Sequence, residues 1–171
     1  MIQSDNSESY FMDIKKIIDK TRDFLINRIT ELLGVLLILF SLFLLISMFS
    51  YSPEDPNFIF NERNKINNLM GEKGSYASDF LFQSFGLVSY LIPLTYFFSG
   101  IKIIKIKNFF LVIQNTFFII LYIFCGSFFF SSYYNKSFEL MINGNGGFIG
   151  DFLSNTFLIN IINLNKNLVY Y

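Results

Sequence analysis

The stretch LLGVLLILFSLFLLISMFSYSPEDP, residues 32–56, joins an uncharged run rich in Leu and Phe to a polar turn. The uncharged part, residues 32–51, has about the 20 residues that a helix rising 1.5 Å per residue needs to cross a hydrocarbon core of roughly 30 Å. A second uncharged run, residues 80–101, follows the polar segment. Together these runs predict an integral membrane protein with two of its helices joined by a loop outside the bilayer.

The composition supports this prediction and narrows the possible functions. The 171 residues are 53% hydrophobic and 20% aromatic, more apolar than a soluble domain of this size needs to be. Thirteen Lys and Arg balance thirteen Asp and Glu, so no global charge indicates a nucleic-acid partner. The chain has no His and no GxxxxGK[ST] phosphate-binding loop, which excludes an autonomous NTPase or metalloenzyme. We therefore expect no catalytic residues, no cofactor and no metal.

Two further segments are candidate membrane helices. Residues 108–134 are uncharged and longer than one crossing requires, whereas residues 152–165 are short and contain four Asn. Pro93 in the second run removes one backbone donor and is expected to kink that helix. The sequence thus predicts an all-α membrane protein with three clear transmembrane helices and a weak or truncated fourth. The fourth segment is expected to enter the membrane only partway and to leave Tyr171 outside the cytoplasm.

The first 31 residues have a different pattern. Residues 1–9 are expected to be disordered, and residues 1–31 as a whole to form a cytoplasmic tail. Apolar residues then recur near helical spacing among charged ones, at Ile14, Ile17, Ile18, Leu25 and Ile29. This pattern predicts an amphipathic helix on the membrane surface, the alternative being a helical extension with a solvated charged face. Residues 32–171 form the expected membrane domain.

The distribution of Lys and Arg predicts the orientation. Eight lie before the first run or between the second and third, at Lys15, Lys16, Lys20, Arg22, Arg28, Lys102, Lys105 and Lys107. Only four lie in the alternate segments, at Arg63, Lys65, Lys73 and Lys136. The positive-inside bias places the N-terminus in the cytoplasm and residues 52–79 and 136–151 outside.

Few polar groups suggest chemistry. Glu54 and Asp55 are the closest carboxylate pair and allow a calcium site, but acids between prolines are ordinary turn residues. A glycine-rich segment, residues 144–150, is similar to a dinucleotide fingerprint, yet a tight turn returning the chain to the membrane explains it better. Gln83 and Gln114 are candidates for hydrogen bonds between helices or for a conduction path. The lone Cys125 is expected to face lipid or a neighbouring helix.

The polar segments also carry a resemblance to a known family. Residues 50–56, SYSPEDP, resemble the SYSPxDP signature that follows the first membrane helix of FtsK/SpoIIIE DNA translocases. The family's N-x-x-G-x-x-G pattern and its next helix are matched at Asn68, Gly71, Gly74, Asp79, Gly86 and Pro93. The glycine-rich entry to the fourth helix is matched at Gly146, Gly147 and Gly150. With Pro53, Asp55 and Pro56, these are the signature positions.

The resemblance implies a four-helix anchor of the bacterial inner membrane, located at the division septum and tethering an ATP-driven DNA pump. Its implied partners are the lipid bilayer, other cell-division membrane proteins and further copies of itself. We expect no direct nucleic-acid contact from this chain and no ATP hydrolysis, because the motor is missing. A truncated gene, a frameshift fragment and a separately encoded subunit are all compatible with the sequence.

Two other function classes remain open from the residues alone. A small channel or transporter subunit unrelated to division would show intramembrane charges or broken helices, and only Pro93 indicates one. A membrane-embedded enzyme would need paired carboxylates, His or a reactive Ser, and Glu54 with Asp55 is the only pair of that kind. We expect Pro53, Asp55 and Pro56 to shape a loop that contacts partners, with simple turn formation as the alternative.

Overall fold

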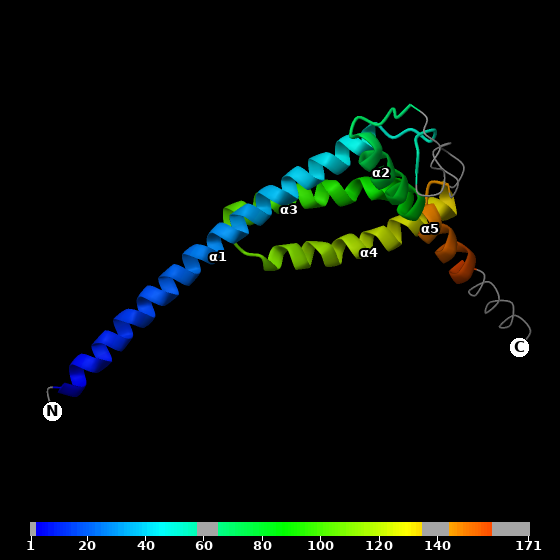
Figure 1. The fold of residues 1–171 in the computed structure, drawn as a ribbon. Helices are drawn as coiled ribbons and strands as arrows, with labels where there is room; N and C mark the ends of the chain where they lie inside the picture. Colours follow the sequence, from blue (N-terminus) through cyan, green and yellow to red (C-terminus); the bar gives the residue numbers. More distant parts are fainter. Residues whose placement is uncertain (1–2, 58–64, 135–143, 159–171) are drawn as a thin grey trace, which may run out of the picture.

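The computed structural model describes residues 3–57, 65–134 and 144–158 (Figure 1). Every regular element in these ranges is helical. The chain order is α1 (Gln3–Phe49), α2 (Gly71–Phe85), the 3-10 helix η1 (Gly86–Tyr90), α3 (Leu91–Ile106), α4 (Phe110–Tyr133), α5 (Gly147–Leu153) and the π-helical η2 (Ser154–Leu158). Three helical stretches are long and apolar enough to cross a membrane, Asp13–Phe49, Gly71–Ile106 and Phe110–Tyr133. The predicted all-α membrane protein with three clear spans is confirmed.

The first helix is longer than expected. α1 is one unbroken helix of 47 residues, about 70 Å at 1.5 Å per residue. Residues 3–9, expected to be disordered, form the first turns of α1, and the amphipathic segment is continuous with the part of α1 that is apolar enough to span. No Gly or Pro interrupts the chain before Gly34, and the Thr30 hydroxyl donates to the Ile26 carbonyl within the helix at 2.7 Å. A straight helix that crosses the bilayer cannot also lie flat on it.

The second predicted helix, residues 80–101, begins nine residues earlier and contains a break. α2 starts at Gly71 and ends at Phe85. The next residue, Gly86, adopts φ 68° and begins the 3-10 turn η1, which redirects the chain into α3. The expected kink at Pro93 is therefore wrong. Pro93 lies in the first turn of α3, where a missing backbone N–H costs least.

α3 runs back along α1, and two glycines allow the close approach of the two helices (Figure 1). A Cβ on Gly34 would lie 2.9 Å from the Gly100 carbonyl oxygen, and a Cβ on Gly100 would lie 2.7 Å from the Gly34 carbonyl oxygen. Such small-residue contacts are typical of helix packing in membranes. At the far end of this pair, Lys107 Nζ lies 2.9 Å from a carboxylate oxygen of Glu31.

α4 packs against α3 through polar and apolar contacts. The hydroxyls of Thr95 and Tyr122 lie 3.0 Å apart, and the Asn115 amide donates to the Ser99 hydroxyl at 2.6 Å. Hydrogen bonds between helices were predicted, but Gln114 is exposed and the neighbouring Asn115 makes the contact. Between these helices lies a buried apolar cluster of Val88, Ile92, Ile119 and Ile123.

The third predicted helix, residues 108–134, agrees closely with α4, Phe110–Tyr133. The fourth begins at Gly147, five residues before the predicted residue 152, because the glycine turn itself starts the helix. Its described part continues through the π-helical turn Ser154–Leu158. Residues 159–165 of the predicted partial helix, and Tyr171, lie outside the described residues.

Candidate functional site

The signature positions other than Pro93 gather at one end of the bundle. There α1 ends, α2 and α5 begin, and α2 contacts both of the other helices (Figure 1). The positions form two groups. We name the first the loop anchor, made of Ser47, Asp55, Asn68, Gly74 and Ser78. We name the second the glycine junction, made of Gly86, Asn145, Gly146, Gly147 and Gly150.

The loop anchor begins with a turn after α1. The Asp55 N–H donates to the Ser52 carbonyl at 3.2 Å, which closes a four-residue turn with Pro53 at its second position. Proline is favoured there because its ring fixes the backbone angle that the turn requires. Pro53 and Glu54 are exposed at the tip, whereas Asp55 and Pro56 are buried. The turn therefore directs the Asp55 carboxylate inward.

The Asp55 carboxylate holds the returning chain. Its two oxygens accept the backbone N–H groups of Asn67 and Asn68, each at 2.8 Å, and the residue is only 4% exposed. Hydrogen bonds to a charged acceptor are stronger than neutral ones. The geometry argues against the calcium alternative, because these oxygens are already used and Glu54 points to the exposed tip.

Asn68 connects this loop to both helices. Its side-chain amide donates to the Ser47 carbonyl at 2.8 Å and to the Ser78 hydroxyl at 3.4 Å, and its Oδ1 accepts the Met70 N–H at 3.0 Å. A Cβ on Gly74 would collide with Asn68 Oδ1. Only glycine at position 74 lets α2 approach the Asn68 side chain this closely.

Asp79 lies about one turn beyond Gly74 on α2 and forms a hydrogen bond with Tyr51, two residues after the end of α1. Its carboxylate accepts the Tyr51 hydroxyl at 3.0 Å, and Asp79 is only 7% exposed. Burial of Tyr51, and then the neighbouring Asp79 charge, raises the pKa of the Tyr51 phenol above its ordinary value. The phenol remains a hydrogen-bond donor at every physiological pH. This hydrogen bond therefore links the residues that follow α1 to α2.

The glycine junction joins the break between α2 and α3 to the start of α5. The Leu87 N–H donates to the Asn145 carbonyl at 2.9 Å. Gly86 and Gly147 both have positive φ, 68° and 64°, and a Cβ on Gly147 would lie 2.5 Å from the Gly86 nitrogen. The tight turn expected in the glycine-rich segment 144–150 is present: the Gly147 N–H donates to the Gly144 carbonyl at 3.3 Å, and both residues have positive φ, which favours glycine.

Serines of α4 complete the junction. The Ser127 hydroxyl donates to the Phe85 carbonyl at 2.9 Å, and the Ser131 hydroxyl donates to the Asp151 carboxylate at 2.6 Å. A Cβ on Gly146 would lie 2.6 Å from the Ser127 carbonyl oxygen. Sequence reasoning missed both serines. Ser127 and Ser131 are four residues apart, as are Gly146 and Gly150. This shared spacing of small residues was the sequence signal that could have identified a contact between the two helices.

The structure thus brings together most of the predicted positions and separates one. Pro93 lies apart, in the first turn of α3. The others lie in or beside the two clusters, with the loop anchor bordered by Pro53, Pro56, Gly71 and Asp79. Among the described residues no three His, Cys, Asp or Glu side chains converge as a metal site would require. Every contact described here fixes backbone or packs helices.

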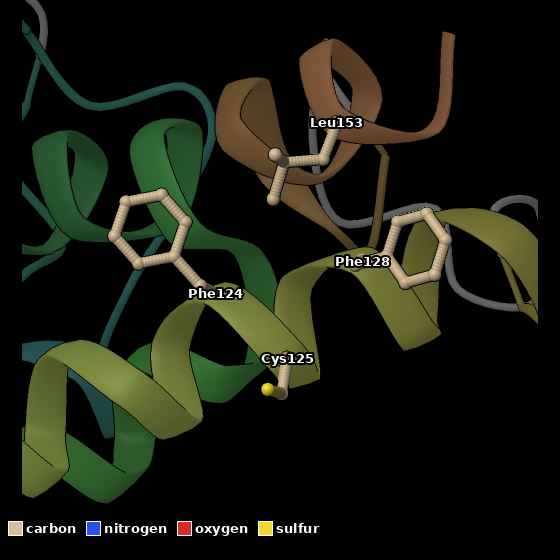
Figure 2. A pocket seen from close by; sticks show the side chains of 4 residues that line it. All are labelled: Phe124, Cys125, Phe128 and Leu153. Atoms are coloured by element: carbon tan, nitrogen blue, oxygen red, sulfur yellow. The ribbon is translucent and has the colours of Figure 1, made fainter. Parts of the chain in front are cut away.

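An open apolar groove lies between α4 and α5 (Figure 2). Its volume is about 230 Å³, and its lining residues are Phe124, Cys125, Phe128 and Leu153. Cys125 is exposed on α4, consistent with the expected position facing lipid. Apart from the Cys125 thiol, the lining consists of apolar side chains.

The comparisons with known proteins agree with this architecture. Residues 27–169 match the model of the family described as "4TM region of DNA translocase FtsK/SpoIIIE". A DNA translocase FtsK of Rickettsia prowazekii (strain Madrid E) is 40% identical over 80 residues, 45% of this chain and 11% of the relative. The same-named protein of Rickettsia bellii (strain RML369-C) is 47% identical over 51 residues, 30% of this chain and 7% of the relative.

The chain therefore spans only about a tenth of the length of these relatives. No solved structure matches it. Its three membrane-crossing stretches and its bacterial relatives make it a multi-pass bacterial membrane protein. Because the family model covers residues 27–169, nearly the whole chain, this protein belongs to the family of FtsK/SpoIIIE 4TM membrane regions.

Proposed function

We propose that this chain is the septal membrane anchor of an FtsK-like DNA translocase and acts in cell division and chromosome segregation. The observation that carries the proposal is the family match over residues 27–169, in which the signature positions form the two clusters. The clusters hold backbone segments in fixed positions. That construction suits a scaffold that presents a surface and performs no reaction.

The proposed orientation has the N-terminus in the cytoplasm. Eight Lys and Arg flank the segments on that side, against four on the other. The loop anchor then lies outside the cytoplasm, and the link between α3 and α4 lies inside. This chain makes no direct contact with nucleic acid in this proposal, and any DNA contact belongs to a motor supplied by another polypeptide or another part of the protein.

Exposed residues around the loop anchor form the proposed contact surface for other division proteins. Phe49 and Leu69 are 78% and 77% exposed, the highest values among the large apolar side chains of the described residues. Pro53 and Glu54 lie exposed at the tip of the adjacent turn. Asp55 and Asn68 support this surface from beneath, since their hydrogen bonds fix the path of the loop.

The test is the position of the tagged chain in dividing cells. With a fluorescent tag at the N-terminus, the chain should gather at midcell during constriction. Leu69→Ser should reduce midcell enrichment while membrane insertion is preserved, and Lys73→Gln, also exposed at the start of α2, should not. Uniform membrane fluorescence of the unmodified chain through constriction would overturn the septal role and favour a channel or transporter subunit.

A further inference from the structure

One face of α3 is left exposed by the helices that pack against it. α3 contacts both α1 and α4 (Figure 1), and its exposed residues before the last one, Ile106, recur at steps of three or four along the helix. This spacing places them on a single face. We name this face the α3 stripe. In chain order it consists of Leu91, Leu94, Phe98, Lys102 and Lys105.

The chemistry of the α3 stripe changes once along its length. Leu91, Leu94 and Phe98 are 45%, 39% and 65% exposed and wholly apolar, and the two lysines follow at the end of α3. From Leu91 to Lys102 the helix rises about 16 Å, close to half of a hydrocarbon core of roughly 30 Å. The apolar part of the stripe therefore has the length of one membrane leaflet, and the lysines lie at the level of the headgroups of that leaflet.

The charge of these two lysines is not balanced by the protein. At the same end of the bundle, Glu31 lies 2.6 Å from Arg28 and 2.9 Å from Lys107, so it partly neutralises both of those cations. Within the described part of the chain, no carboxylate forms an ion pair with Lys102 or Lys105. The link that follows α3 contains no acid either. The stripe thus ends in two positive charges that are available to a ligand.

An apolar face of one leaflet's length that ends in two cations is complementary to a phospholipid with a net negative charge. We propose that the α3 stripe binds an anionic phospholipid, whose acyl chain lies along the two leucines and Phe98 and whose phosphate contacts Lys102 and Lys105. The apolar stems of the lysines lie along the helix while their ammonium groups reach the phosphate. A zwitterionic lipid fits less well, because the lysines repel the positive group of its headgroup.

The basic residues of α1 offer a comparison for the lysines of the stripe. Lys15 and Lys16 are exposed and lie twelve or more residues before Arg28, about 18 Å or more along the helix. That separation exceeds the Debye length of about 8–10 Å at physiological salt. Removing the charges of Lys15 and Lys16 should therefore leave the electrostatic field at the stripe nearly unchanged.

The test uses the absence of Trp from the chain. The full chain with Phe98→Trp is reconstituted in phosphatidylcholine vesicles that contain brominated phosphatidylglycerol or brominated phosphatidylcholine, since bromine quenches Trp fluorescence on contact. Quenching at this reporter should show a preference for phosphatidylglycerol of at least roughly fivefold, because one lysine near an anionic surface contributes a factor of that order.

Phe117→Trp is the matched control reporter. Phe117 is 62% exposed on α4 and lies seven residues after the start of that helix, whereas Phe98 lies eight residues before the end of α3, so the two have similar depth. The two lipids should quench the Phe117→Trp reporter nearly equally. An equal preference for phosphatidylglycerol at both reporters would overturn the proposal.

Two charge variants test whether the lysines of the stripe cause the preference. Lys102→Gln with Lys105→Gln should abolish it at the Phe98→Trp reporter, whereas Lys15→Gln with Lys16→Gln, which removes the same charge elsewhere, should leave it unchanged. A preference that persisted in the first variant, or that was lost equally in both, would overturn the proposal.

Lipid binding by the stripe is independent of the septal role, because the vesicles contain only this chain and lipid. It is also independent of orientation, because both leaflets of the vesicles contain the anionic lipid. If the Phe98→Trp reporter showed no preference in the otherwise unmodified chain, the proposal would be overturned, and a membrane-protein partner with an acidic group would be the better occupant of this face.

Discussion

Replacing Asp55 by alanine should destabilise the protein although position 55 lies in a loop. In the structure the carboxylate accepts the N–H groups of Asn67 and Asn68, each at 2.8 Å. Asn68 is buried, so its N–H would be left without a partner, at a cost of about 1–3 kcal/mol. Asn67 is exposed and its N–H can bond to water instead. Losing its hydrogen bond to Asp55 therefore costs only about 0.5–1.5 kcal/mol.

We therefore expect Asp55→Ala to lower the free energy of unfolding by about 2–4 kcal/mol. Thermal unfolding of the full chain in detergent measures the overall loss. Hydrogen exchange locates it: since about 1.4 kcal/mol corresponds to a factor of ten, the Asn68 amide should exchange roughly 30 to 700 times faster.

Glu54→Ala is the matched control, because it removes the same charge from the adjacent, exposed position. We expect it to change stability by less than about 0.5 kcal/mol. If the two alanine variants unfolded at the same temperature and the Asn68 amide exchanged at the same rate in both, the loop anchor would not hold the loop in place.

Two further predictions concern orientation and packing. A cysteine at Lys65, in a Cys125→Ser background, should react with a membrane-impermeant thiol reagent added outside, whereas one at Lys105 should not; the opposite labelling would reverse the proposed topology. Gly146→Ala should destabilise the protein by about 3 kcal/mol in thermal unfolding, because its Cβ would lie 2.6 Å from a backbone oxygen. Gly71→Ala, with no atom within 4 Å of its Cβ, should cost only the backbone strain of about 1–2 kcal/mol; equal losses would argue against the close contact.

The spans could be predicted because they depend on length and hydropathy alone. The predicted segment 108–134 lies within two residues of α4 at each end, and the first span ends two residues before the predicted residue 51. The start of α2 could not be predicted in this way, since Glu72, Lys73 and Asp79 interrupt the apolar pattern. The helix extends through them because Asp79 is bonded to Tyr51 and the other two remain exposed.

The candidate site was only partly predictable for a related reason. Motif spacing selected Asp55, Gly74 and Gly86, but not what they touch. Asp55 bonds residues 12 and 13 positions further along the chain, and those contacts depend on the path of the intervening loop. The kink was assigned to Pro93 because proline is the usual cause, whereas Gly86 changes direction through a positive φ that no pattern of hydropathy reveals.

The unbroken course of α1 has a mechanical consequence. From its contact with α3 at Gly34 to Gln3, α1 extends over roughly 31 residues, about 46 Å. With no hinge along that length, a tilt of about 10° at the contact displaces Gln3 by about 8 Å. A rotation of α1 within the bilayer likewise turns its far end by the same angle. Any event that shifts the bundle at the loop anchor is therefore transmitted through α1 to its N-terminal end.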